Sequence, residues 1–260
     1  MTAQPVLFLS HGSPMTAIEA DDLGSAWRAH APRLGRPDAI VMVSAHWMTN
    51  IPMVSSAEQP DTIHDFGGFP EALYRLRYPA PGAPALAERI KQRLTDNGLA
   101  AGADPRRGLD HGAWIPLMFL FPDADIPVLQ VSVQPDRGAH HHLAVGEALA
   151  PLREENVLII GSGHMTHNLR DLFMDGGRMR HETRAFRDWA HGQLMNHQRD
   201  ALLAWSDEGP NARLAHPTPE HFLPLFVALG AAGPEARTEH LGGGTVHDIL
   251  AADNYLFASA

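Results

Sequence analysis

The chain has 260 residues, of which 44% are hydrophobic and 19% charged, so it can bury a sizeable core and is not globally disordered. Its 30 acidic residues outnumber its 20 Lys and Arg residues, and the formal net charge of −10 excludes general electrostatic binding to a nucleic acid. The absence of Cys excludes disulfides, thiolate metal sites and a cysteine nucleophile. The 17 His residues point to imidazole chemistry, because His is the commonest metal ligand and also carries protons near neutral pH.

No targeting or membrane-spanning segment is evident in the sequence. The first residues lack a basic segment, and the apolar run Val6–Leu9 is far too short for a signal peptide. Other apolar runs are also much shorter than the roughly 20 residues that a spanning helix needs. We therefore expect a cytoplasmic protein without a membrane partner, and we find no signature of an oligomeric state.

The predicted elements alternate between strands and helices. Apolar runs without alternation, which are typical of strands covered on both faces, predict strands at Val6–Leu9, Ala39–Ser44, Ile126–Val133 and Val157–Ile160. Amphipathic segments predict helices at Pro84–Asn97, His141–Glu154, Glu182–His197 and Pro219–Leu229. Thr218 is the expected cap of the last helix. This order predicts a single α/β domain over residues 1–260, with a central, mostly parallel or mixed sheet flanked by helices.

A subset of the histidines follows the predicted strands directly. His11 and His46 each end an apolar run, and His164 and His167 follow the run that contains Gly161. Because ligands bind at the carboxyl ends of the strands in α/β sheets, these imidazoles are expected to converge on one point. Such a cluster suits a metal with nitrogen ligands and open positions. Of His164 and His167, only one is expected to face the site.

Three further segments combine a His with an acidic residue. The segment Thr62–Pro70 contains His64 and two Phe, and it fits either a loop that closes over an aromatic ligand or a structural turn. His111 lies within Leu109–Trp114. Glu220 and His221 are adjacent, and only one of them is expected to reach a shared centre, because successive helical residues point about 100° apart.

The remaining histidines are interpreted as structural or solvated. We expect His140, His141 and His142 to form a solvated run, and we assign no role to His216. Polar neighbours predict surface positions for His30, His181, His191, His197 and His240. The common signatures of serine hydrolases, zinc proteases and nucleotide-binding loops are absent, and neither Ser10 nor Ser162 lies in a nucleophile-elbow context.

Seven motifs, in this order, carry a family resemblance. They are SHGSP (10–14), SAHW (44–47), TIHDFGGFP (62–70), YPAPG (78–82), LDHGAW (109–114), HNL (167–169) and PTPEHFLP (217–224). Together they resemble the LigB-type (class III) extradiol ring-cleavage dioxygenases, in particular the 4,5-DOPA dioxygenase-like branch. The resemblance extends from about Pro5 to the C-terminus.

The resemblance implies one divalent metal in a single α/β domain. The expected ligands are His11, His46 and His221, with Glu220 as the alternative third ligand. Fe(II) is implied for activity, although Zn(II) can occupy the same ligands. The implied reaction opens the ring of a catecholic, DOPA-like substrate with O₂ to give a muconic semialdehyde.

The resemblance also implies roles for three further histidines. His167 is expected to act as the acid and base, or as an additional ligand, and His111 is expected to assist oxygen binding or proton delivery. His64 is expected to contact the substrate. Two alternatives remain at this point: a zinc-dependent hydrolase on the same fold, and a non-catalytic metal-binding relative.

Overall fold

An eight-stranded mixed sheet forms the centre of the computed structural model, which describes residues 3–19, 22–173 and 180–259. The strand order is β4-β3-β5-β2-β6-β1-β10-β7. The strands are β1 (Val6–Ser10), β2 (Ala39–Met48), β3 (Met53–Ser55), β4 (Gly102–Asp104), β5 (Val128–Val133), β6 (Val157–Gly163), β7 (Arg237–His240) and β10 (Tyr255–Ala258). A separate hairpin contains β8 (Thr245–Val246) and β9 (Leu250–Ala251).

The four central strands, β5, β2, β6 and β1, pair in parallel. They correspond to the four strands predicted from apolar runs, and most of their residues are buried. The antiparallel strands β10 and β7 extend the sheet beyond β1. The α/β fold class with a mostly parallel sheet is therefore confirmed.

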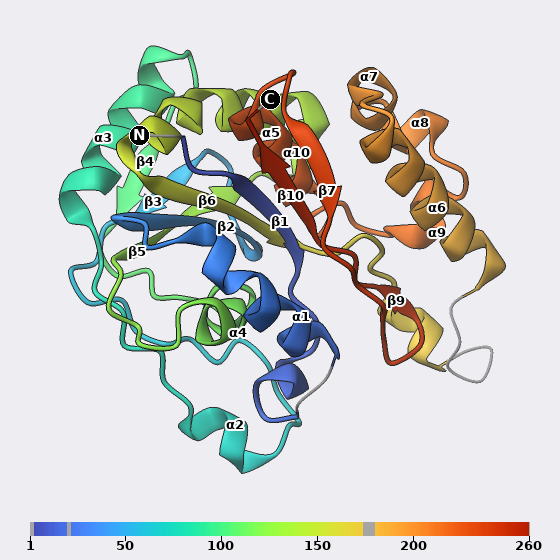
Figure 1. Ribbon diagram of the computed structural model, residues 1–260, viewed down its shortest axis with the longest axis horizontal. Coiled ribbons are helices and arrows are strands. Elements are labelled where there is room, and N and C mark those ends of the chain that lie inside the picture. The colour runs from blue at the N-terminus through green and yellow to red at the C-terminus, as the bar shows by residue number, and fades with distance from the viewer. Residues whose placement is uncertain (1–2, 20–21, 174–179, 260) are drawn as a thin grey trace.

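Helices cover both faces of the sheet (Figure 1). Alternate residues of β1 point to opposite sides, so that Val6 and Phe8 belong to one apolar cluster and Leu7 and Leu9 to the other. The helices of eight or more residues are α1 (Asp22–His30), α3 (Pro84–Asp96), α4 (His111–Leu120), α5 (Gly138–Leu149), α6 (His181–Met195) and α10 (Leu223–Ala232). The shorter helices are α2 (Glu71–Arg75), α7 (Arg199–Leu203), α8 (Trp205–Glu208) and α9 (Ala212–Ala215).

Two predicted helices differ from the observed ones at their ends. The segment predicted at Pro219–Leu229 begins with a turn, in which Phe222 N–H donates to Pro219 C=O, and α10 itself begins at Leu223. Thr218 is therefore not its cap; the Thr218 hydroxyl donates to the Glu220 carboxylate. The helix predicted at His141–Glu154 ends as α5 at Leu149 and continues as a 3₁₀ helix that contains a proline.

The carboxyl ends of β1, β2 and β6 meet at one edge of the sheet, since these strands are parallel neighbours. The segment before α10 and the first turn of α4 lie at the same edge, as shown by backbone and side-chain contacts to these strand ends. None of the helices within the described ranges is long and apolar enough to span a bilayer.

Candidate metal centre and active site

The strand ends enclose a cavity of about 290 Å³. It is lined by five of the histidines predicted to form the site: His11, His46, His111, His167 and His221. Phe66, Phe69 and Leu169 supply apolar walls. The predicted convergence of residues from distant parts of the chain is therefore present in the structure.

His11 and His46 face each other across this cavity. Their Nε2 atoms are 3.0 Å apart. His11 Nδ1–H donates to Ser162 Oγ at 3.1 Å, because the Ser162 hydroxyl hydrogen is directed at the Gly112 carbonyl. In its neutral form, His11 therefore keeps an unprotonated Nε2 that can bind a cation.

His221 supplies a third nitrogen from the segment before α10. Its Nδ1–H donates to Glu220 Oε1 at 3.0 Å. Its Nε2 is buried and has no hydrogen-bond partner among the described residues. Leaving a buried polar atom unpaired costs about 1–3 kcal/mol, so this nitrogen is suited to an additional ligand.

The three histidines together could hold one metal ion. One nitrogen from each of His11, His46 and His221 lies within 4.8 Å of the others. Three neutral nitrogen donors fit a divalent transition metal and leave further positions for substrates. The contact of Glu220 with the far nitrogen of the His221 ring favours His221 over Glu220 as the third ligand.

Burial keeps these three imidazoles neutral. It lowers the pKa of His46 to about 4, with a further contribution from the nearby His111. Burial also lowers the pKa of His11 and His221 well below the usual histidine value. Neutral imidazole is the form that binds metal, so the site does not need to lose protons at pH 7 before it binds a cation.

Two glycines allow the ligand-bearing segments to approach one another. A Cβ atom on Gly163 would lie 2.0 Å from the His221 carbonyl oxygen, and the next residue, His164, donates its backbone N–H to that oxygen at 2.8 Å. A Cβ atom on Gly112 would lie 2.5 Å from Ser44 Oγ and 3.1 Å from His46 Cδ2. The end of β6 therefore packs directly against the segment that carries His221, and the first turn of α4 packs against the end of β2 that carries His46.

The two histidines after β6 have different positions, as expected. His167 lines the cavity and stacks on His221, with ring centroids 3.4 Å apart and planes at 9°. His164 is buried behind it, where its Nε2 accepts a hydrogen bond from Gly12 N–H. Burial lowers the pKa of His167 to about 2, so its ring is a neutral proton acceptor in the unliganded site.

His64 lies outside the residues that line the cavity. Its Nε2 contacts the Leu76 carbonyl oxygen at 3.1 Å, and its ring lies 5.7 Å from those of Phe66 and Trp114. Phe66 itself lines the cavity. His64 therefore does not line the cavity but packs against Phe66, which does, whereas the other five predicted histidines border the cavity directly.

Some expectations for the remaining histidines are wrong. His142 is fully buried, donates from Nδ1 to Gly138 C=O and accepts the Gln134 N–H at Nε2, so it is not part of a solvated run. His191 and His240 are partly buried and group with Asp253. Arg187 binds both carboxylate oxygens of Asp253, and its positive charge opposes a cation there.

Sequence reasoning did not identify the polar residues that hold the histidines in place. Asp110 is fully buried, accepts from Ser44 Oγ and pairs with Arg107, while the Ser44 hydroxyl oxygen accepts the His46 N–H. The only feature of the sequence that points to Asp110 is its position next to His111. The sequence suggests Ser162 only as a candidate nucleophile, whereas in the structure its hydroxyl oxygen accepts from His11.

The family model described as the catalytic LigB subunit of aromatic ring-opening dioxygenase matches residues 5–258. The 4,5-DOPA dioxygenase extradiol of Beta vulgaris is 42% identical over 257 residues, which cover 97% of this chain and 96% of that protein. The 4,5-DOPA dioxygenase extradiol of Escherichia coli K12 is 41% identical over 243 residues, which cover 88% and 86% of the two chains.

A solved structure supports the same relationship. The crystal structure of an uncharacterized protein from Escherichia coli K12 matches with a TM-score of 0.82 and 32% identity, over 97% of this chain and 99% of the other. The fold, the family match and the relatives agree across nearly the whole chain. The chain therefore belongs to the LigB family of aromatic ring-opening dioxygenases, and it is an extradiol dioxygenase of the branch that contains the 4,5-DOPA dioxygenases.

Proposed function

We propose that this single-domain enzyme uses O₂ to open the ring of a DOPA-like catechol, giving a muconic semialdehyde, with one divalent metal held by His11, His46 and His221. The observation that carries the proposal is the unpartnered Nε2 of His221, which belongs to a group with the facing Nε2 atoms of His11 and His46. This arrangement has three neutral donors and no acidic ligand, so the charge of a metal dication would remain available to a catecholate.

Fe(II) is the metal proposed for activity, because it supplies the electron transfer between catechol and O₂ that zinc cannot supply. Zinc in the same ligands would still hold the three histidines in place. A dioxygenase would therefore be active with Fe(II) and inactive with Zn(II), whereas the alternative function, a zinc-dependent hydrolase, would be active with Zn(II).

His167 is the proposed acid and base. It borders the cavity beside the proposed ligand His221 and is neutral in the unliganded site, so it can take the proton of a catechol hydroxyl. The catecholate that results favours the protonated form of the adjacent ring, because opposite charges attract in a buried site. The proton then remains available for return to the opened product.

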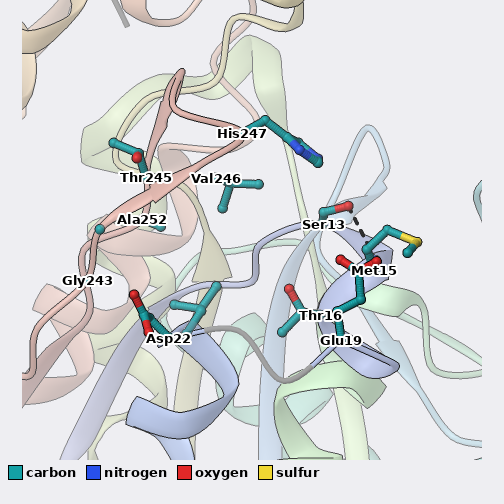
Figure 2. Close-up of a pocket in the computed structure, with 12 residues that line it drawn as sticks. Ser13, Met15, Thr16, Glu19, Asp22, Gly243, Thr245, Val246, His247 and Ala252 are labelled. Atoms are coloured by element: carbon teal, nitrogen blue, oxygen red, sulfur yellow. Dashed lines mark hydrogen bonds between the residues drawn. The ribbon is translucent and has the colours of Figure 1, made fainter. Parts of the chain in front are cut away.

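The cavity has room for a ring and for a substituent on it. Phe66, Phe69 and Leu169 provide apolar surface for the aromatic part. A second cavity of about 230 Å³ adjoins the first and shares Ser13, Val246 and His247 with it. Figure 2 shows Ser13 facing the hairpin residues Val246 and His247 across this second cavity.

Glu19 and Asp22 also line the second cavity. Their carboxylates would favour a substituent with an ammonium group, such as the side chain of DOPA. We therefore propose that the ring lies in the first cavity and that the substituent extends into the second. His64, which packs against Phe66, would influence the substrate through that wall.

The test is anaerobic reconstitution with Fe(II), followed by addition of DOPA and O₂. We expect a yellow ring-opened product and O₂ uptake equal to the substrate consumed. Zinc-loaded enzyme is the matched control and is expected to form no such product. If Fe(II)-loaded enzyme opens no simple catechol, or if the zinc enzyme hydrolyses esters without O₂, the proposed function is wrong.

A His167→Ala variant tests the assignment of the acid and base. General acid–base groups contribute roughly 10²–10⁴-fold to rate, so we expect kcat to fall by about 100-fold or more while one metal per chain is retained. Metal content by elemental analysis is the second readout. Loss of the metal would instead identify His167 as a ligand.

A further inference from the structure

Asp65 contacts two of the cavity histidines from outside the cavity. Its Oδ1 accepts the backbone N–H of His111 at 2.9 Å, and its Oδ2 accepts from His111 Nδ1 at 3.0 Å. The same Oδ2 lies 3.6 Å from His46 Nδ1, which is an electrostatic contact rather than a hydrogen bond. Both oxygens of this carboxylate are thus directed at the site.

Asp65 is ionised at neutral pH. Its Oδ1 accepts the backbone N–H of His111, which favours the carboxylate form, and an Asp side chain ordinarily loses its proton at about pH 4. A carboxylate without a proton can only accept hydrogen bonds. The ring hydrogen of neutral His111 is therefore on Nδ1, and Nε2 is left unprotonated.

The backbone fixes the position of Asp65 relative to His111. Ile63 N–H donates to the Leu109 carbonyl at 2.7 Å, and Leu109 N–H donates to the Asp61 carbonyl at 2.8 Å. Trp114, one turn into α4, donates its indole N–H to the Ile63 carbonyl. These bonds tie the segment before Asp65 to the start of α4, so the carboxylate and the imidazole form one rigid unit.

We propose that Asp65 is a positioning residue for the ring-opening reaction, which holds His111 as the Nδ1–H tautomer and keeps its Nε2 an unprotonated acceptor at the cavity. The role of Asp65 in ring opening rests on the proposed function, whereas the tautomer of His111 does not depend on it. His111 Nε2 has no partner among the described residues and remains free for a substrate.

This arrangement restricts what His111 can do. In its neutral form it accepts a proton or a hydrogen bond, and it donates from Nε2 only after it has taken up a proton. His111 is thereby a proton acceptor first, and any delivery of a proton to an oxygen intermediate follows that uptake. The Asp65 carboxylate stabilises the resulting positive ring, because it lies within hydrogen-bond distance of Nδ1.

An Asp65→Asn substitution reverses the tautomer with little change in shape. The amide oxygen of Asn can still accept the His111 backbone N–H, while the amide NH₂ faces Nδ1 and donates to it. The ring hydrogen of His111 is then on Nε2. Asp104→Asn is the matched control, because Asp104 also accepts a backbone N–H, from Arg106, and lies on β4 at the edge of the sheet.

The tautomer can be read without any activity. In zinc-loaded, ¹⁵N-histidine-labelled protein, long-range ¹H–¹⁵N spectra distinguish the protonated from the unprotonated ring nitrogen, and a His111→Gln sample assigns the signal. We expect a protonated Nδ1 in the parent protein and in Asp104→Asn, and a protonated Nε2 in Asp65→Asn. A protonated Nε2 in the parent protein would overturn the proposal, whether or not the enzyme opens catechols.

Kinetics of the Fe(II)-loaded enzyme provide a second test of the positioning role of Asp65. Mutations of residues that orient site histidines typically cost roughly 10–100-fold, so we expect Asp65→Asn to lower kcat by that factor with KM for catechol changed less than about threefold. Asp65→Glu should recover part of kcat, because it restores a carboxylate. An unchanged kcat, or a loss of bound metal in parallel with activity, would contradict a positioning role.

Discussion

Two of the three proposed ligands, His11 and His221, are held by a neighbour that accepts a hydrogen bond from Nδ1. Ser162 accepts from His11, and Glu220 accepts from His221. The oxygen of Ser162 is available for this bond only because its hydrogen is directed at the Gly112 carbonyl. The direction of one hydroxyl group thus decides which nitrogen of His11 can bind a metal.

Ser162→Ala is therefore expected to weaken metal binding. Without the acceptor, His11 is free to carry its hydrogen on Nε2, and residues that orient metal-binding histidines are commonly worth roughly 10–100-fold in affinity. A competition titration against a chelator measures the change. Ser132→Ala on β5, another buried serine, is the control and should bind metal as the parent does.

At this scale the sequence predicted the histidines better than their partners. His11 and His46 could be found because each follows an apolar strand, and strand ends converge in a parallel sheet. Asp65 and Ser162 could not be assigned, because their contacts span 46 and 151 residues of sequence. The burial of His142 cannot be predicted, because a run of three histidines gives no sign that one of them faces the core.

At the scale of the elements, α5 and α10 pack closely against each other through two glycines. A Cβ on Gly230 of α10 would lie 2.1 Å from the Leu143 carbonyl, and one on Gly146 of α5 would lie 2.1 Å from the Val227 carbonyl. The two backbones therefore touch without intervening side chains. On the side of the sheet, Gly161 and Gly163 of β6 closely approach the Pro224 and His221 carbonyl oxygens, which places α10 and the segment before it against the sheet.

Gly230→Ala should lower the free energy of unfolding by about 2–3 kcal/mol, because the new methyl group must push the helices apart. Urea unfolding measures the change. Gly192→Ala in α6 is the control: nothing lies within 4 Å of its Cβ, and Ala is a better helix former by about 0.5–1 kcal/mol, so this variant should be slightly more stable. Equal effects of the two substitutions would argue against the close helix contact.

The elements differ in how well the sequence predicted them. The central strands were found because burial on both faces makes them continuously apolar. The start of α10 was misplaced, since prolines and the capping residue Thr218 imitate a helix start where the structure has a turn. The short strands β7 and β10 lack a distinctive pattern of their own: β10 depends on pairing with β1, and β7 depends on pairing with β10.

On the scale of the whole molecule, Asp253 joins segments from both ends of the chain. Its carboxylate pairs with Arg187 of α6 and His240 of β7, and its carbonyl accepts from Ser10 of β1. Burial raises the pKa of Asp253, but the bonds from His240 and Arg187 outweigh burial and lower it. The ionised form is therefore more stable in the folded protein than in the unfolded chain.

Asp253→Asn should cost about 2 kcal/mol of unfolding free energy at pH 7, below the figure for a fully buried pair because Arg187 is partly exposed. Because the pKa of Asp253 is lower in the folded protein, its carboxylate stabilises the fold at pH values above the unfolded-state pKa of about 4. This stabilisation is lost as the pH falls through the lower pKa of the folded state. The difference in unfolding free energy between parent and variant should therefore narrow as the pH falls below about 5, as measured by urea titrations at successive pH values. A gap that is constant over this range would exclude the charge as its source.

The three proposed ligands lie at positions 11, 46 and 221 of the sequence. A ribosome must synthesise 221 residues before the last ligand exists, and β6 must already be in place to receive the segment that carries it. If these three residues hold the metal, its binding by all three follows synthesis of most of the chain, and a chain that ends before residue 221 contains only two of the proposed ligands, His11 and His46. Tight metal binding would then indicate that the chain has folded completely, and a pulse-labelled nascent-chain experiment could follow this binding over time.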